Sequence, residues 1–329
     1  MRKYFLLSII LFLSLSTNAQ YINYSQFYSS PHSLNPALSG SGEYGRVGFI
    51  YRNQWPLIDN GYQYFTSWVD YNLSSSNFSI GMNFSNEKQG ITNLTTSHIS
   101  SSLAYEINLN YNWIFRSGIQ ISFANSNFNS QDFLFYDQFS QGGLINLSQE
   151  NLSNFDKVNY INLAIGLIAY SKNIWFGSSI YNLPKPNISF SGKIENLERL
   201  FSFHGGYNFL IRDTKNQNIS IVPAFNYRIV SNINQLDLGS FINFTPILLG
   251  IWYRGIPISS NNNIESLIGI LGIKNDDFNI SYTYDYSLSK LKGLTGGAHE
   301  ISLVYQFNFL GKKLPPKNVR MLQCPIPNF

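Results

Sequence analysis

The side chains most able to do chemistry are four histidines and one cysteine, and none lies in a reactive pattern. The histidines are His32, His98, His204 and His299. Only His299 has an acidic neighbour, Glu300. Adjacent residues of a strand face opposite ways, so this pair cannot hold one metal ion together. Cys324 is the single cysteine, which excludes an intrachain disulfide.

Catalysis by a serine nucleophile has no local motif to support it. A Ser–His–Asp or Ser–His–Asn site on a sheet needs its three side chains on neighbouring strands and on one face. Serine and asparagine are so abundant that chance candidates arise, and Asp276-Asp277 is typical of a turn rather than of a calcium loop. We therefore predict a protein that is not an enzyme and that binds no cofactor or metal.

The densest group of special residues lies near the N-terminus, from Ser25 to Trp55. It contains SQFYSSPHSLNPALSG and, after a short gap, YRNQWP. Proline, asparagine and glycine punctuate the first part, which is typical of irregular backbone. No carboxylate–histidine pair and no glycine-rich phosphate loop occurs in this stretch. It is therefore predicted to be a structural or binding element that leads into a first strand.

Residues 1–19 have the parts of a secretory signal peptide. Met1-Arg2-Lys3 is a positive start, Tyr4–Leu15 is an apolar run, and small residues before the Ala19–Gln20 bond suit cleavage there. The apolar run is too short for a transmembrane helix, which takes about 20 residues. The mature chain is therefore predicted to be exported and to begin at Gln20.

Composition favours a surface in contact with lipid over a soluble domain. Charged residues make up 12% of the chain, about half the usual share, whereas aromatic residues reach 16%. Lysine and arginine number 22 against 18 acids, so loss of Arg2 and Lys3 leaves 20 against 18 and lowers the net charge from +4 to +2. No dense basic patch accompanies this surplus, so binding to nucleic acid is not predicted.

Apolar and polar residues alternate with a period of two through most of the chain. One face of the segment 158–170 carries Ile161, Leu163, Ile165 and Leu167, and the other carries Asn162, Ala164, Gly166 and Ile168. The same period recurs at 45–52, 278–286 and 300–309. Successive side chains of a strand face opposite sides, so each predicted strand has one apolar face and one polar or small face.

This alternation predicts about fourteen antiparallel strands, many of them about ten residues long or longer. Their ranges are 45–53, 63–73, 77–85, 95–106, 109–124, 158–170, 173–181, 200–210, 218–228, 233–244, 246–254, 263–274, 277–287 and 298–309. Strands of this length cross a bilayer when tilted, whereas strands of soluble sheets have about five or six residues. No long apolar run follows the signal peptide, so helical membrane spans are not predicted.

The predicted connections alternate between short and long. Those after even-numbered strands are mostly short, at 74–76, 107–108, 171–172, 245–246 and 275–276, and those after odd-numbered strands are mostly longer, at 54–62, 86–94, 125–157, 182–199 and 288–297. Outer-membrane barrels have short periplasmic turns and long external loops, and an even strand count returns both termini to the periplasm. Tryptophans near strand ends are typical of interfacial girdles: Trp55, Trp68, Trp113, Trp175 and Trp252.

We therefore predict an all-β transmembrane outer-membrane barrel rather than a soluble sandwich. Residues 1–19 are the signal peptide, 20–44 an N-terminal periplasmic or luminal segment, 45–309 the barrel, and 310–329 a short periplasmic tail. The tail is rich in proline and has four basic residues and no acid, so it is predicted to be extended.

Strand parity places Arg46 and Arg52 on the inner face of the predicted barrel. There they can meet the N-terminal segment or acids such as Asp285 and Glu300. An arginine facing lipid at mid-bilayer would cost roughly 2–4 kcal/mol. The first strand must pair with the last to close the sheet, which brings the two ends of the strand series together. The N-terminal segment is predicted to assist closure and to plug the barrel.

Three sequence blocks bracket the mature chain. The first is Ser25-Gln26-Phe27-Tyr28 with Asn35-Pro36-Ala37 and Gly40, followed by Tyr51-Arg52-Asn53-Gln54-Trp55. The second is Tyr284-Asp285-Tyr286-Ser287-Leu288-Ser289 with Gly297-Ala298-His299-Glu300-Ile301, and the third is Cys324-Pro325 with the terminal Phe329. Together these blocks resemble the PorP/SprF family of the Bacteroidetes type IX secretion system.

The resemblance implies a non-enzymatic outer-membrane component that supports secretion or surface anchoring of specific cargo. Such cargo includes large gliding adhesins with type B C-terminal sorting domains. Contact with outer-membrane lipid and with periplasmic secretion components is also implied. The motif residues, as structural or partner contacts, are Ser25, Gln26, Phe27, Asn35, Pro36, Ala37, Gly40, Arg52, Asn53, Gln54, Trp55, Gly297, His299 and Glu300.

An alternative is a transporter of small hydrophobic compounds similar to the FadL family. Those proteins are also fourteen-stranded barrels, and an N-terminal hatch with an Asn-Pro-Ala motif fills their lumen. Asn35-Pro36-Ala37 would fit such a hatch. The block from Arg52 to Trp55 and the C-terminal tail would then have no explanation.

Overall fold

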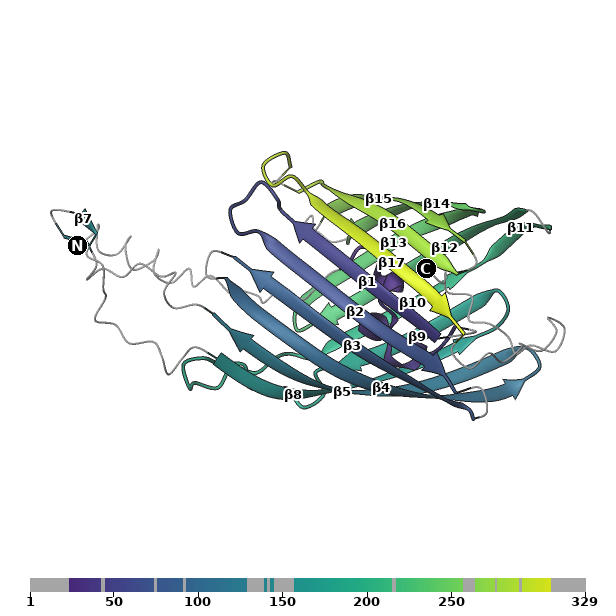
Figure 1. The fold of residues 1–329 in the computed structure, drawn as a ribbon, viewed down its shortest axis with the longest axis horizontal. Coiled ribbons are helices and arrows are strands. Elements are labelled where there is room, and N and C mark those ends of the chain that lie inside the picture. The colour runs from purple at the N-terminus through teal and green to yellow at the C-terminus, as the bar shows by residue number, and fades with distance from the viewer. Residues whose placement is uncertain are drawn as a thin grey trace.

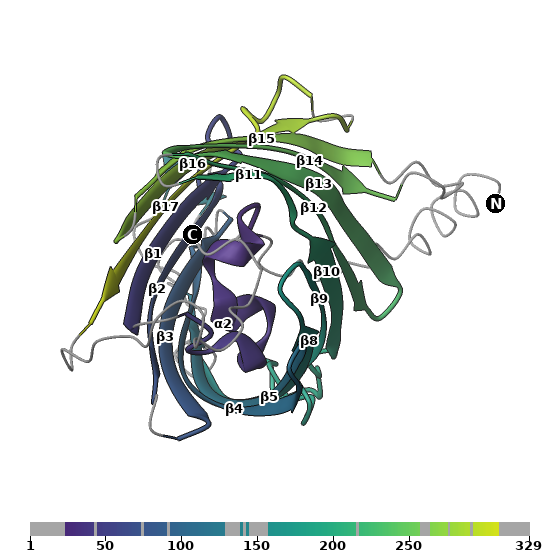
Figure 2. The same cartoon turned by 90° about the vertical axis from the view of Figure 1, so that its right-hand side faces the viewer.

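The structure is a computed structural model, and it shows a closed antiparallel β-barrel around three short helices (Figure 1 and Figure 2). It describes residues 24–42, 45–73, 76–90, 93–128, 139–140, 143–144, 157–214, 217–256, 264–275, 277–289 and 292–308. The predicted signal peptide, with Ala19 and Gln20, and the predicted tail 310–329 lie outside these residues. No helix in the described part is long and apolar enough to cross a membrane.

The elements follow the chain in a simple order. The helices are η1 (Phe27–Ser29), α2 (Pro31–Leu34) and η2 (Pro36–Leu38). The strands are β1 (Gly45–Gln54), β2 (Tyr62–Asn72), β3 (Phe78–Gln89), β4 (Leu94–Asn110), β5 (Trp113–Asn127), β6 (Phe139–Ser140), β7 (Gly143–Leu144), β8 (Lys157–Tyr170), β9 (Ile174–Tyr181), β10 (Leu200–Tyr207), β11 (Phe209–Thr214), β12 (Gln217–Val230), β13 (Ile233–Phe244), β14 (Ile247–Gly255), β15 (Ile264–Lys274), β16 (Phe278–Ser287) and β17 (Ala298–Phe307). Strands β6 and β7 pair only with each other.

The barrel wall has fourteen strand positions, as predicted. Strands β10 and β11 are separated only by Asn208, and both pair with β12, so they share one position. Every other neighbour along the wall follows the chain, apart from the closing pair β1 and β17. These two pair from Gly45 opposite Phe307 to Gln54 opposite Ala298. The two ends of the strand series are therefore neighbours in space.

Side-chain parity makes the outer face apolar, which suits a lipid environment. In β8, Leu163 and Leu167 are 44% and 46% exposed, whereas Ala164 and Ile168 on the other face are buried. The same alternation of exposed and buried residues runs along β3 and β16. The apolar face of these strands therefore points away from the lumen, opposite to the packing of a soluble sandwich.

Strands β3 and β4 are longer than predicted. The pairing of β3 continues past the apolar region, whereas β4 continues through Ile107 and Leu109, exposed apolar residues that the prediction assigned to a turn and to the next strand. Strand β3 runs to Gln89 and β4 to Asn110, so the predicted connections 86–94 and 107–108 become 90–93 and 111–112. The added pairs between β3 and β4 join polar residues, such as Glu87 with Thr96. Polar side chains on both faces give no period-two signal, although the ladder hydrogen bonds persist.

The girdle interpretation is wrong for three of the five tryptophans. Trp68, Trp175 and Trp252 are no more than 4% exposed and belong to the inner face. Trp113 is 38% exposed at the start of β5, and Trp55 is half-buried in the connection after β1. The inward tryptophans have a different task, which is to pack against the N-terminal segment.

Candidate functional site

The barrel interior is occupied by residues 24–42, which we call the plug segment (Figure 2). Its three helices have only three or four residues each. Helices of this length are not stable alone, so their shape depends on the wall around them. Pro31 and Pro36 begin two of the turns, and the Asn35 side chain accepts a hydrogen bond from the backbone N–H of Ala37 at 2.9 Å.

One end of the plug segment is bound by an arginine of β5. This arginine lies near the turn 111–112, at the end of the barrel where the short turns are, which we call the short-turn end. Arg116 donates from Nε to the Ala37 carbonyl at 3.0 Å and from Nη2 to the Ser39 carbonyl at 2.5 Å. Glu106 faces the same guanidinium at 2.8 Å. These bonds satisfy carbonyls at the end of η2 that have no helical partner of their own.

A second ion pair, between β1 and β2, contacts the residues that follow η2. Arg46 binds Asp70 through Nε at 3.0 Å and through Nη2 at 2.5 Å, and both side chains are buried. Asp70 also accepts the backbone N–H of Gly40 at 2.8 Å. Gly40 has φ +59°, and a Cβ there would lie 2.6 Å from the Cβ of Ser79, so glycine is required at this point.

Two wall glycines make room for Asn35, Pro36 and Ala37. A Cβ on Gly166 of β8 would lie 1.9 Å from Asn35 Oδ1, and one on Gly118 of β5 would lie 2.4 Å from the Ala37 nitrogen. Asn35 Nδ2 then donates to the carbonyls of Leu167 at 2.9 Å and Ser178 at 3.1 Å. The Asn-Pro-Ala motif thus fits a hollow that these two glycines leave in the wall.

The other end of the plug segment meets Glu300 of β17, near the long connections. Glu300 is fully buried and accepts the backbone N–H groups of Ser25 at 2.9 Å and of Gln26 at 2.8 Å. Gln26 is also fully buried and donates from Nε2 to Thr283 at 2.7 Å. Its Oε1 accepts the hydroxyl of Ser302 at 2.6 Å. A buried carboxylate is stabilised by such donors.

Arg52 joins this end of the plug segment to a buried chain of charges. It donates to Ser25 Oγ at 2.7 Å, to Glu300 at 3.1 Å and to Asp285 at 2.9 Å. Arg254 lies 3.4 Å from Asp285 and bonds Asp237 at 2.8 Å. Each buried charge in this chain faces an opposite charge, which is the condition for keeping ions inside a protein.

The opposite side of the plug segment is apolar. Tyr28, Leu34 and Leu38 join a buried cluster with wall residues. The ring centroids of Tyr28 and Phe241 are 4.5 Å apart, and those of Phe27 and Trp252 are 5.0 Å apart, both edge to face. Burial of these aromatic rings adds hydrophobic stabilisation to the polar anchors.

His32 lies at the centre of the plug segment in a setting that resembles a catalytic triad. Its Nδ1 is 3.0 Å from Ser102 Oγ and 3.1 Å from Ser39 Oγ, and its Nε2 is 4.0 Å from Asp70. Burial lowers the pKa of His32 to about 4, although Asp70 opposes that effect. The ring is therefore neutral at neutral pH. Asp70 is already paired with Arg46, and His32 is 1% exposed, so this group packs the plug segment rather than meeting a substrate.

The predicted motif residues fall into two groups. The structure brings Ser25, Gln26, Phe27, Asn35, Pro36, Ala37, Gly40, Arg52 and Glu300 together inside the lumen. The inward direction of Arg46 and Arg52 follows the parity prediction.

The remaining motif residues lie at or beyond the long-connection end of the seam. His299 pairs with Asn53 across the β1–β17 seam, and its Nδ1 is 2.6 Å from the hydroxyl of Tyr282. Gln54 accepts from Arg52 at 3.3 Å. The Trp55 N–H donates to the Gly297 carbonyl at 2.8 Å, which extends the seam past the strands. Any contact of these residues with a partner stays a prediction.

Most of the wall residues that receive the plug segment were not predicted from the sequence. Arg116, Asp70 and Arg254 sit at ordinary inward positions, and nothing in their neighbours marks them. Their inward parity was available as a signal, because a charged residue on the small face of a membrane strand needs a partner in the lumen. Gly118 and Gly166 likewise lie on the inner face, where most other positions carry side chains, so their lack of a side chain was a second available signal.

The site offers binding and anchoring groups rather than reactive ones. Among the described residues, no group of three His, Cys, Asp or Glu side chains could hold a metal ion. Hydrogen bonds to the wall already engage the side chains of Ser25, Gln26, Asn35 and Ser39. The arrangement can therefore hold a peptide in the lumen, and the peptide present is the N-terminal segment of the same chain.

Comparison with known proteins identifies one family. A profile described as type IX secretion system membrane protein PorP/SprF matches residues 16–305. Comparison with curated protein sequences finds no match.

Several solved structures have a similar architecture at low identity. A FadL homologue from Pseudomonas aeruginosa has a TM-score of 0.43 and 9% identity, over 85% of this chain and 95% of that one. The outer membrane protein Omp33 of Acinetobacter baumannii has a TM-score of 0.44 and 7% identity, over 80% and 98%. CdiB from Acinetobacter baumannii has a TM-score of 0.43 and 9% identity over 80% of this chain, which spans 60% of CdiB. At these values the similarities add nothing about function.

Proposed function

The chain belongs to the family of type IX secretion system membrane proteins PorP/SprF, and from that membership we propose that it supports secretion or surface anchoring of specific cargo. The cargo class that we propose is large gliding adhesins with type B C-terminal sorting domains. Family and barrel fold together point to a non-enzymatic component of the outer membrane.

The family profile over residues 16–305 is the observation that best supports this function, and the docked plug segment agrees with it. The contacts of this segment reach strands on every side of the lumen, from β1 and β2 through β5 and β8 to β16 and β17. A barrel filled in this way supplies surfaces and anchoring points rather than an open conduit. This suits a protein that holds or hands over cargo, because the cargo does not then have to pass through its lumen.

The proposed orientation follows the usual asymmetry of outer-membrane barrels. The connections 55–61, 182–199 and 288–297 leave one end of the barrel, and the turns at 111–112 and 171–173 leave the other. We place the long connections outside the cell, where cargo would be met, and the short turns in the periplasm. Strand β17 ends at the short-turn end, so the C-terminal tail would meet periplasmic secretion components. The plug segment rises from that end until Tyr24 lies beside Arg254, near the long connections.

Deletion of the gene followed by a quantitative survey of surface proteins tests the proposal. We expect particular adhesins to disappear from the surface while most surface proteins stay unchanged. Complementation with the wild-type gene should restore them. A variant that lacks the external connection 182–199 is expected to insert into the membrane but to restore cargo poorly, because cargo choice is proposed to lie in the long connections.

The second candidate is a transporter of small hydrophobic compounds. The observation that favours it is the Asn35-Pro36-Ala37 motif held inside the lumen, as a hatch would be. An unchanged surface proteome in the deletion strain, together with impaired uptake of a hydrophobic nutrient, would support this candidate and contradict the secretion role.

A further inference from the structure

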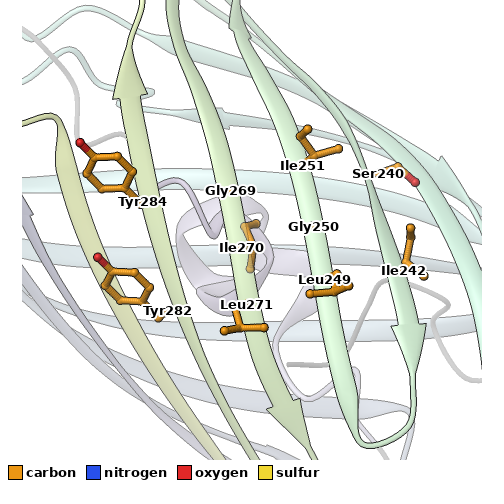
Figure 3. Close-up of a pocket in the computed structure, with 10 residues that line it drawn as sticks. All are labelled: Ser240, Ile242, Leu249, Gly250, Ile251, Gly269, Ile270, Leu271, Tyr282 and Tyr284. Atoms are coloured by element: carbon orange, nitrogen blue, oxygen red, sulfur yellow. The ribbon is translucent and has the colours of Figure 1, made fainter. Parts of the chain in front are cut away.

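The outer wall carries an apolar groove over β13, β14, β15 and β16 (Figure 3). Its volume is about 510 Å³, within the range of small-molecule sites. The exposed apolar side chains around it are Ile242, Leu249, Ile251 and Leu271, with the rings of Tyr282 and Tyr284 at one side. The groove therefore lies on the face of the barrel that the membrane covers.

Two small outward residues create the groove. Gly269 occupies the middle of β15 between the outward residues Leu267 and Leu271, where the strand pattern would otherwise place a large apolar side chain. A Cβ added at Gly269 would meet no atom within 4 Å. Ser240 of β13 is the second small residue on this face. The hollow thus arises from missing side chains rather than from a break in the sheet.

The strand pairing beneath the groove is continuous. Gly269 is paired with Ile251 on one side and with Tyr284 on the other. On the inner face, Ile270 and Trp252 are buried against the lumen. A groove with such a floor keeps its shape, because the wall strands are held by ladder hydrogen bonds and by the packed interior.

One side of the groove has a polar rim. The Tyr282 hydroxyl is 2.6 Å from His299 Nδ1, and the rings of Tyr284 and His299 are 5.0 Å apart. These three residues come from β16 and from the seam strand β17. Such groups can hydrogen-bond the ester or head group of a lipid whose chain lies in the groove, as amphipathic aromatic side chains do at membrane interfaces.

We propose that this groove binds one acyl chain of an outer-membrane lipid. The groove is continuous with the surrounding lipid-facing surface, so hydrocarbon reaches it directly. A chain lying in the hollow gains contacts on three sides, whereas a chain on the flat wall gains them on one, and each added atomic contact contributes dispersion energy. The site therefore orders a lipid beside the β16–β17 rim. This inference does not depend on the secretion role.

Photo-crosslinking in vesicles tests the proposal with the full-length mature protein. The protein is reconstituted into phosphatidylethanolamine vesicles that contain a trace of the same lipid with a photoactivatable acyl chain. We expect labelling to be concentrated on Leu249, Ile251 and Leu271, several-fold above outward residues elsewhere on the belt. In the Gly269→Leu variant the added side chain fills the hollow, so labelling there should fall to the level of the rest of the belt.

The matched control is Ser101→Leu, which adds the same side chain at an exposed position of β4 far along the wall from the groove. It should leave the labelling of the groove unchanged. Heat-dependent mobility on gels verifies that all variants are folded barrels. Uniform labelling of the belt in the wild-type protein would overturn the proposal. So would crosslinks from the groove in native membranes that join it to a protein chain instead of to lipid.

Discussion

The inner and outer faces of the same wall use glycine for different ends. Gly166 on the inner face leaves a hollow filled by Asn35, whose Oδ1 would lie 1.9 Å from an added Cβ. Gly269 on the outer face leaves a hollow in which an added Cβ would meet nothing within 4 Å. The first hollow is shaped for one segment of this chain, and the second is open to lipid. What each of these two glycines makes room for therefore depends on whether its position faces the lumen or the lipid.

Charge divides the two faces in the same way. Arg46, Arg52, Arg116 and Arg254 are all buried on the inner face, and each has a carboxylate partner. Among the exposed large hydrophobic residues, isoleucine, leucine and phenylalanine are the most frequent. Each wall strand thus has one face toward lipid and one face toward the lumen, where the plug segment supplies hydrogen-bonding groups.

The largest effect is expected from Gly166→Leu. The larger side chain displaces Asn35, which loses three hydrogen bonds of about 1 kcal/mol each, and overpacking adds about 1–3 kcal/mol, so docking of the plug segment weakens by about 4–6 kcal/mol. Protease sensitivity of the N-terminal segment and ion conductance in planar bilayers should both rise. Gly269→Leu serves as the control and should change neither. A protected N-terminal segment in Gly166→Leu would contradict the fit of Asn35 in this hollow.

Removal of one buried charge should have the next largest effect. Arg52→Met leaves Asp285 and Glu300 buried without their main partner, which should destabilise the barrel by about 3–5 kcal/mol. The measurement is the urea midpoint for unfolding in lipid vesicles. Lys172→Met, at an exposed turn, is the matched control and should shift stability by less than about 0.5 kcal/mol. Equal midpoints for the two variants would show that Arg52 does not hold the seam.

A charge placed on the outer face tests the other half of the comparison. Ile121→Arg introduces a guanidinium near the middle of β5, where the native side chain is 54% exposed. The expected loss of stability is about 2–4 kcal/mol, because a lipid-facing arginine near mid-bilayer is poorly solvated. Tyr111→Arg, in the turn between β4 and β5, should lose far less. A cost at Ile121 no greater than at Tyr111 would place β5 outside the hydrocarbon.

The smallest effect concerns pH. The pKa of His32 is lowered to about 4 inside the lumen, from an ordinary value near 6.5, because burial disfavours the charged ring. Asp70 and Arg46 are the charged groups that face it, and they act in opposite directions. Docking stability is therefore complete above pH 6.5 and falls as pH drops toward 4, with a loss of about 2 kcal/mol at pH 5.

Protease protection of the plug segment, measured from pH 7 to pH 5, checks this expectation. His32→Gln removes this titrating ring, so its protection should fall by less than that of the wild type over the same range. A wild-type protein whose protection stays constant to pH 5 would show that protonated His32 is accommodated without loss. A variant with the same pH dependence as the wild type would assign the effect to another group.

Much of the wall could be predicted from the sequence because the membrane imposes a simple period. Alternation located all fourteen strand positions, and parity placed Arg46 and Arg52 inside. The end of β3 could not be located, since polar pairs such as Glu87 with Thr96 continue the ladder without an apolar face. The end of β4 was predicted too early, because the alternation through Ile107 and Leu109 runs on toward β5 without a break. The break at Asn208 between β10 and β11 also has no period-two signature.

The contents of the lumen were harder to predict than the wall. The motif blocks marked the plug segment, and its luminal position was one of two expectations for it. Its receptors are scattered over strands far apart in the sequence, such as Asp70 on β2 and Arg116 on β5. Long-range pairing of this kind depends on the closed barrel, so no local pattern announces it. The inward tryptophans show the same limit, because position near a strand end did not distinguish lumen from interface.

The seam between β1 and β17 has a consequence for how the barrel assembles. Arg52 and Glu300 are 248 residues apart in the chain and bond to each other and to Ser25. Bringing such distant segments together costs about 5 kcal/mol of chain entropy. The plug segment offers the last strand a ready set of donors beside the first, and thus acts as a template on which the sheet can close. A chain without residues 24–42 should therefore accumulate as an open, protease-sensitive sheet during insertion.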